Sequence, residues 1–114
     1  MEFTTKVKEV IAQRAGYRCC FPGCGRLLVG PDSDPHKSVN IGECAHIYAA
    51  AEDGPRGRGS LTDAELTSSE NGLFLCHAHH KMIDRPGSHT KYPSSLLLYY
   101  KVMHEHEILV KWAC

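Results

Sequence analysis

An apolar stripe at helical spacing opens the chain and predicts an amphipathic helix over residues 2–15, with Gly16 placed to end it. The stripe consists of Val7, Val10, Ile11 and Ala15. Residues 17–29 (YRCCFPGCGRLLV) lose this period and hold a Pro-Gly pair between cysteines. They predict a compact knuckle built on a turn.

The middle of the chain combines loop-like and strand-like segments. Residues 30–37 are polar and hold two prolines, so they predict a loop. Residues 38–48 (SVNIGECAHIY) carry β-branched residues in partial alternation and predict an extended segment. Residues 49–60 (AAAEDGPRGRGS) predict a glycine-rich basic loop.

Two helices and a strand are predicted next. A short helix is expected over residues 61–70, because Thr62 can cap it together with Glu65 three residues later. Residues 71–76 (NGLFLC) begin with a turn dipeptide and continue as an apolar strand. Residues 77–84 (HAHHKMID) predict the helix that follows this strand.

The last predicted element is a helix over residues 94–112, which Ser94 or Ser95 can cap. Its apolar residues fall near one face, which we expect to pack on the core. These residues are Leu98, Val102, Leu109 and Trp112.

A length of 114 residues predicts a single domain. A domain of this size buries only about two-thirds of its unfolded surface, so a further stabilising element is expected. The six cysteines accompany eight histidines, and the charged start of the chain does not resemble a secretory signal. Together these features favour metal over disulfides and a cytoplasmic location. The formal net charge of zero counts against holding nucleic acid by charge alone.

Two cysteines of the knuckle are candidate metal ligands. Cys19 and Cys24 flank the Pro-Gly turn, so their thiolates can converge on one ion. Cys20 could replace Cys19, and the spacing does not decide between them. Thiolate and imidazole are ligands that zinc prefers.

The second pair of zinc ligands must come from the stretch LCHAHHKMID. Cys76 can share a helix face with His79 or with His80. Adjacent helical residues point about 100° apart, since a turn takes roughly 3.6 residues. One histidine can therefore complete a Cys3His site while the other faces a second site.

The second site would combine residues that are distant in sequence. His46 ends a predicted strand beside the basic loop, Asn71 opens the next strand, and His80 follows on the helix. A lone histidine at a strand end is more often structural than functional. The three together give the order His, Asn, His around a cysteine knuckle.

These blocks resemble the HNH (ββα-metal, His-Me finger) endonucleases. They are most similar to bacterial HNH domains found in anti-phage effectors, fused to sensors of cyclic oligonucleotides. The resemblance covers residues 17–107 and implies an α+β fold in one domain, residues 1–114. Its parts would be a zinc knuckle (17–29 with 76–79), a ββα-metal core (about 39–85) and flanking N- and C-terminal helices. The matching segments are the two knuckle cysteines, GECAHI, GPRG, SENGLFLC, the HH of HAHHKMID, and KYPSSLLLYYKVMHEHE.

The resemblance also implies a role for each site residue. His46 would be the general base, Asn71 would orient it, and His80 would bind the catalytic divalent ion. That ion would be Mg²⁺ or Mn²⁺, with Ni²⁺ or Zn²⁺ as further candidates. A structural zinc would be held by Cys19, Cys24, Cys76 and His79.

One position departs from the broader HNH pattern. Many HNH domains have an Asp before the first His of the motif, where this chain has Ala45. The second protein ligand of the catalytic ion is therefore open between Glu43 and Asp84. Arg56 and Arg58 are expected either to contact a DNA backbone or to belong to a solvated loop.

The sequence as a whole predicts a metal-dependent DNA endonuclease that acts as an anti-phage effector. Its expected partners are DNA and a regulatory or sensor domain or subunit, with no membrane association. One active site cuts one strand, so activity on both strands predicts a dimer or higher assembly. The rival hypothesis is a non-catalytic, zinc-stabilised nucleic-acid-binding module, and a third is an interaction adaptor.

Overall fold

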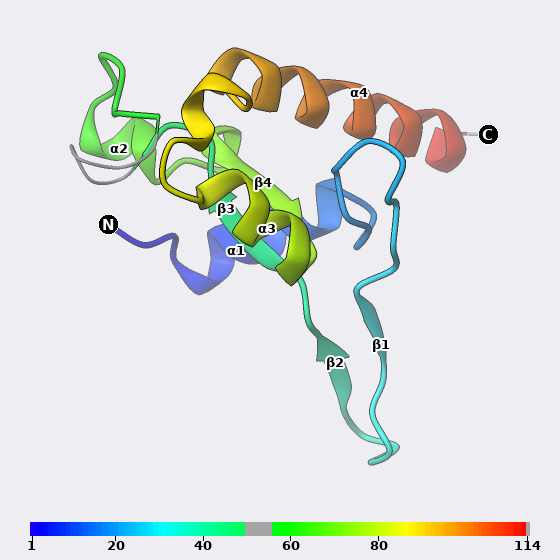
Figure 1. The fold of residues 1–114 in the computed structure, drawn as a ribbon. Coiled ribbons are helices and arrows are strands. Elements are labelled where there is room, and N and C mark those ends of the chain that lie inside the picture. The colour runs from blue at the N-terminus through cyan, green and yellow to red at the C-terminus, as the bar shows by residue number, and fades with distance from the viewer. Residues whose placement is uncertain (50–55, 114) are drawn as a thin grey trace.

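The computed structural model describes residues 1–49 and 56–113. It confirms the predicted α+β fold, in which two small antiparallel sheets combine with an N-terminal helix and a long C-terminal helix (Figure 1). Part of the predicted basic loop, residues 50–55, lies outside the described residues, as does Cys114. Within the described part of the chain, no helix is long and apolar enough to cross a membrane.

The N-terminal helix α1 (Thr5–Arg14) confirms the prediction with shorter bounds. The Thr4 hydroxyl caps it by accepting a hydrogen bond from the Val7 amide at 3.2 Å. Its buried side packs on the strand that begins at Gly72. A Cβ atom at Gly72 would lie 2.2 Å from Cδ1 of Ile11, so this approach of helix to strand requires glycine.

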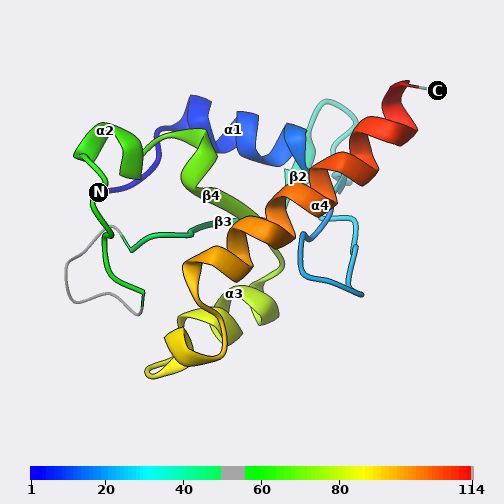
Figure 2. The same cartoon turned by 90° about the horizontal axis from the view of Figure 1, so that it is seen from above.

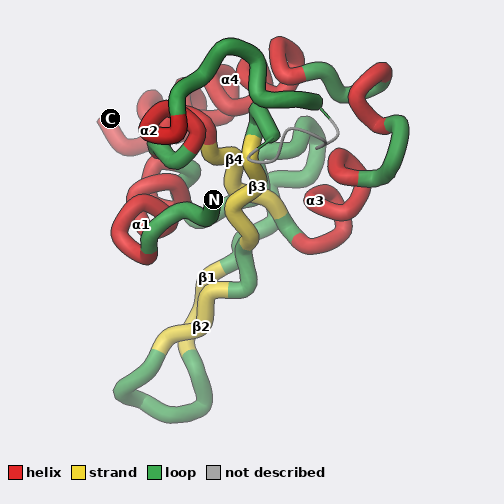
Figure 3. Tube along the Cα trace, turned by 90° about the vertical axis from the view of Figure 1, so that its left-hand side faces the viewer, coloured by secondary structure: helices red, strands yellow, loops and turns green. Residues whose placement is uncertain are grey.

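The loop predicted for residues 30–37 is the tip of a β-hairpin, except that Gly30 and Pro31 belong to its first strand. Strands β1 (Val29–Pro31) and β2 (Ser38–Asn40) pair antiparallel and project from the body of the molecule (Figures 1 and 3). The predicted extended segment over residues 38–48 is therefore two strands. It breaks after β2, where the Asn40 side chain accepts a hydrogen bond from the Gly42 amide at 2.9 Å and turns the chain.

The centre of the fold is a second antiparallel pair followed by a helix. Strand β3 (Glu43–His46) pairs with β4 (Gly72–Leu75), with Cys44 opposite Phe74 and His46 opposite Gly72. Every residue of β4 is buried, because α1 contacts it and the core closes around it. Only Cys76 separates β4 from helix α3 (His77–Asp84), so the two strands and α3 form a ββα unit.

Short helices fill the connections around this unit. Helix α2 (Asp63–Leu66) has the predicted capping box. The Thr62 hydroxyl accepts a hydrogen bond from the Glu65 amide, and the Glu65 carboxylate accepts one from the Thr62 amide. Two single turns of 3₁₀ helix, η1 (Ser69–Asn71) and η2 (Ser88–Thr90), precede β4 and the C-terminal helix.

The C-terminal helix α4 (Ser94–Ala113) crosses the molecule and continues past its body (Figures 1 and 2). The prediction that its apolar face packs on the core holds for Leu98 alone and is wrong for the other three residues, because the side that the helix buries carries Ser94, Leu97 and Lys101. Of the predicted face, Leu98 is half-buried and packs against the core, whereas Val102, Leu109 and Trp112 are exposed. Trp112 is 82% exposed because the last turns extend beyond the other elements. The Ser94 hydroxyl donates to the Ile47 carbonyl at 3.1 Å instead of capping the helix.

Candidate functional site

The knuckle after α1 is held by its own backbone. The Cys19 amide donates to the Arg26 carbonyl at 2.9 Å, and the Leu28 amide donates to the Tyr17 carbonyl at 2.8 Å. A tighter turn inside this ladder joins the Cys24 amide to the Phe21 carbonyl at 3.0 Å. The ladder and the turn together bring both cysteines to the same end of the knuckle.

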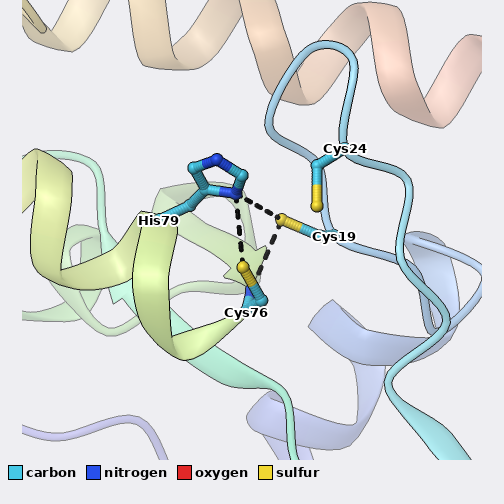
Figure 4. Close-up of side chains that lie close together, drawn as sticks. All are labelled: Cys19, Cys24, Cys76 and His79. Carbon is cyan, nitrogen blue, oxygen red and sulfur yellow. Dashed lines mark hydrogen bonds between the residues drawn. The ribbon is translucent and has the colours of Figure 1, made fainter.

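The knuckle and the start of α3 together form a four-residue cluster (Figure 4). Its ligand atoms all lie within 4.8 Å of one another. Nδ1 of His79 is 3.7 Å from Sγ of Cys19 and 3.2 Å from Sγ of Cys76. The Cys76 amide also donates to the Cys19 sulfur at 3.3 Å. The members of the cluster are Cys19, Cys24, Cys76 and His79.

This donor set suits a tetrahedral zinc ion. With bonds of about 2.3 Å to sulfur and about 2.0 Å to nitrogen, neighbouring ligand atoms would lie roughly 3.5 Å apart, close to the distances found. Burial raises the pKa of Cys19 to about 12. A thiolate there needs a nearby cation, and zinc is a cation that deprotonates the thiols it binds.

Packing fixes which neighbours belong to the cluster. The His79 ring stacks on Phe21 with centroids 4.1 Å apart, which holds its Nδ1 toward the cysteines. Cys20 was the alternative to Cys19, but its amide bonds to the Phe74 carbonyl at 2.9 Å and its buried side chain is not in the cluster. The structure therefore selects Cys19, and it selects His79 over His80.

His46 lies at the end of β3, partly covered by the N-terminus. Phe3 stacks on its ring with centroids 4.1 Å apart, and the Nε2 atom is buried with no hydrogen-bond partner among the described residues. Burial is the main cause that lowers the pKa of His46, so the ring is neutral at pH 7.

Asn71 acts on the backbone that follows His46 rather than on its ring. Its Oδ1 accepts from the Tyr48 amide at 2.8 Å, and its Nδ2 donates to the carbonyls of Tyr48 and Leu66 at 3.1 and 2.9 Å. The Asn71 carbonyl also accepts from the Ile47 amide at 2.9 Å. Asn71 therefore contacts the chain just after β3, and the predicted orienting role would be indirect.

His80 faces away from the cysteine cluster and lies between two carboxylates. Its Nδ1 is 2.7 Å from Oε1 of Glu43, and its Nε2 is 3.0 Å from Oδ2 of Asp84. The hydrogen bond to Asp84, and then that to Glu43, raise the pKa of His80 against the effect of burial. The two open candidates for the second ion ligand thus both contact this one ring.

The two arginines of the basic loop have separate places. The Arg58 side chain is partly exposed and pairs with Asp63 at the start of α2. The Arg56 side chain is only 2% exposed and donates to protein acceptors, including Asp84 at 2.9 Å. This differs from both expectations for Arg56, because a guanidinium enclosed in this way can reach neither a DNA backbone nor bulk water.

Several contacts at the site had no signal in the sequence. Phe3 lies more than forty residues from the ring it stacks on, and nothing in its neighbourhood marks it. His77 has Nδ1 2.9 Å from Oε2 of Glu43, although its side chain is mostly exposed. Only the histidine-rich composition of α3 could have drawn attention to His77.

Comparison with known proteins agrees with this geometry. A family model described as HNH endonuclease matches residues 19–86, which is more than half of the chain. The match begins at the first cysteine of the cluster and ends just after α3, so it includes the whole ββα unit. The search of curated proteins gave no match. With this match over more than half of its length, the chain belongs to the HNH endonuclease family.

Proposed function

We propose that this chain is a metal-dependent DNA endonuclease in which His80 and Asp84 hold the catalytic divalent ion and His46 activates water. Membership of the HNH family supports phosphodiester hydrolysis as the reaction. The observation that carries the proposal is the His80 ring held between two carboxylates, next to the strand end that bears His46.

The two carboxylates would have different tasks. Glu43 accepts at Nδ1 of His80, and a carboxylate behind a metal-binding histidine fixes the tautomer that leaves Nε2 free to bind. Asp84 lies one helical turn after His80 and places an oxygen at that same Nε2. Asp84 is therefore the better candidate for the second ligand, and Glu43 for the group that orients His80.

A bound divalent ion would stabilise charge on the scissile phosphate and on the departing oxygen. His46 would accept the proton of the attacking water at Nδ1, since its ring is neutral at pH 7. Asn71 would keep that ring in place by holding the backbone of Tyr48. Arg58 would exchange Asp63 for a DNA phosphate, because its side chain is partly open to solvent.

The test is a plasmid-nicking assay with Mg²⁺ or Mn²⁺ and with EDTA as the metal-free reference. His46→Gln is the informative variant, because it fills most of the space under Phe3 that alanine would leave empty. We expect cleavage to fall at least about 100-fold, the lower range for loss of a general base, while zinc content and melting temperature stay near wild type. His36→Ala, in the exposed hairpin loop, is the matched control.

A second candidate is a zinc-stabilised nucleic-acid-binding module without catalysis. One observation favours it: Phe3 stacks on His46 and encloses Nε2, as expected for a structural histidine. DNA binding without nicking in either metal, together with a large loss of stability in His46→Gln, would select this candidate and reject the endonuclease.

We further propose that the nuclease works as an anti-phage effector that becomes active on assembly. The support is the resemblance of GECAHI, GPRG and KYPSSLLLYYKVMHEHE to such effectors, together with the formal net charge of zero, which predicts weak binding to DNA by a lone copy. Cleavage should then rise more steeply than linearly with protein concentration. A strictly first-order dependence would contradict activation by assembly.

A further inference from the structure

Arg56 makes the most extensive set of side-chain hydrogen bonds around the candidate site. Its Nε donates to the Ile47 carbonyl at 2.8 Å, and its Nη1 donates to the Ile83 carbonyl at 2.7 Å. Its Nη2 donates to the His46 carbonyl and to Oδ1 of Asp84, both at 2.9 Å. One side chain thus has four protein acceptors.

These acceptors belong to the two elements that carry the proposed chemistry. His46 ends β3 and Ile47 follows it directly, while Ile83 and Asp84 form the end of α3. Carbonyls in the last turn of a helix lack partners within it, and the Ile83 carbonyl accepts from two side chains outside α3, those of Arg56 and Ser88. The guanidinium therefore joins the strand that bears the base to the helix that bears the ion ligands.

We propose that Arg56 is a positioning residue, which sets the Asp84 carboxylate and the His46 backbone in one fixed arrangement for ion binding and catalysis. This rests on the proposed function. By occupying Oδ1 of Asp84, Arg56 leaves Oδ2 facing Nε2 of His80 at 3.0 Å. The planar guanidinium has five donors in a rigid fork, so it fixes directions as well as distances.

The same geometry argues against the view that Arg56 acts only through its positive charge. A cation placed for DNA contact would be exposed, whereas the side chain of Arg56 is almost fully enclosed. Burying a charge costs free energy that only good geometry repays, so stability by itself is a weak reason for an ion pair at this place. Lysine would keep the charge but would lose the fork, since a single ammonium cannot reach acceptors on both elements in the same way.

The experiment compares Arg56→Lys and Arg56→Gln with wild type. Mn²⁺ binding is followed by electron paramagnetic resonance, and nicking rate, zinc content and melting temperature are measured on the same samples. We expect both variants to bind Mn²⁺ about 10- to 100-fold more weakly, the usual range for loss of an outer-shell partner, and to keep their zinc. The matched control is Arg14→Lys, since Arg14 bonds Glu105 through Nε and Nη2 but joins α1 to α4.

A double-mutant cycle separates positioning from a general effect on the fold. Once Asp84→Asn has weakened Mn²⁺ binding, adding Arg56→Gln should weaken it little further, because both changes act on one carboxylate. Additive effects, or Mn²⁺ binding in Arg56→Gln equal to wild type, would overturn the proposal. Failure of both Arg56 variants to fold would also overturn it, by making Arg56 a fold element.

Failure of the proposed function gives a different result. If wild-type protein neither binds Mn²⁺ nor nicks DNA, the endonuclease proposal fails whatever the Arg56 variants do. If wild type is active and the Arg56 variants match it in Mn²⁺ affinity, only the positioning role is rejected.

Discussion

The neighbouring residues His79 and His80 provide the sharpest test, since the structure places them in different sites. Nδ1 of His79 lies 3.2 Å from the Cys76 sulfur, whereas both ring nitrogens of His80 contact carboxylates. Replacing each with alanine should therefore produce two unlike proteins. His79→Ala should lose zinc and stability together, and His80→Ala should keep its zinc and lose divalent-ion binding and cleavage.

The expected magnitudes differ widely. Structural zinc is worth about 10–16 kcal/mol in small zinc-binding peptides, similar to the whole stability of a small domain. Losing one of four ligands, together with the stacking of His79 on Phe21, should leave His79→Ala largely unfolded at 37 °C. The carboxylates on His80 are more than one-third exposed, so solvent screens these pairs and their loss should cost about 1 kcal/mol. That loss corresponds to a fall in melting temperature of roughly 5 °C.

The assay measures zinc content, melting temperature and nicking rate for both variants side by side. His77→Ala is the matched control on the same helix, since His77 also contacts Glu43 but is mostly exposed. Exchange of the two phenotypes would reverse the assignment of the histidines. Equal loss of zinc in both variants would mean a single metal site and would refute the two-site reasoning.

Three further predictions concern the cluster, the pH dependence and the core. Cys24→Ser should lose zinc and fail to fold, whereas Cys20→Ser should keep its zinc, as metal analysis of both proteins will show. The pKa of His80 is raised above 6.5, so without added divalent ion its contribution to stability is full below pH 6.5 and is lost as the pH rises through the folded value. The stability difference from His80→Ala, measured in urea, should therefore shrink as the pH is raised above 6.5. Mn²⁺ affinity should rise over the same interval, and a fall would contradict the assignment. Gly72→Ala should cost about 1–3 kcal/mol by forcing α1 away from β4, while Gly30→Ala, with nothing within 4 Å of its Cβ, should cost less.

Local signals in the sequence determined the parts of the fold that depend on near neighbours. The capping box at Thr62 closes over three residues, and Cys76 lies within one helical turn of the histidine that it pairs with, although the spacing left His79 and His80 both possible. Such contacts depend on backbone geometry that the sequence spacing fixes. The ββα unit and the family could be recognised for the same reason, because short segments of sequence identify both of them.

Only the tertiary structure decided which side chains reach the site when their partners are distant in sequence. Cys19 was preferred to Cys20 because the Cys20 amide pairs with Phe74, on a strand more than fifty residues away. Arg56 turns inward because its acceptors lie at the ends of β3 and α3, which meet only in the folded chain. A polar loop sequence carries no trace of such acceptors.

The C-terminal helix shows the same limit in its packing. Its apolar positions support two overlapping stripes, and the sequence could not show which stripe meets the core. The body of the protein ends before the helix does, so Trp112 is left in solvent although its spacing fits a buried face. Periodicity thus determined that a helix forms, whereas the surface available to pack against decided which of its sides is buried.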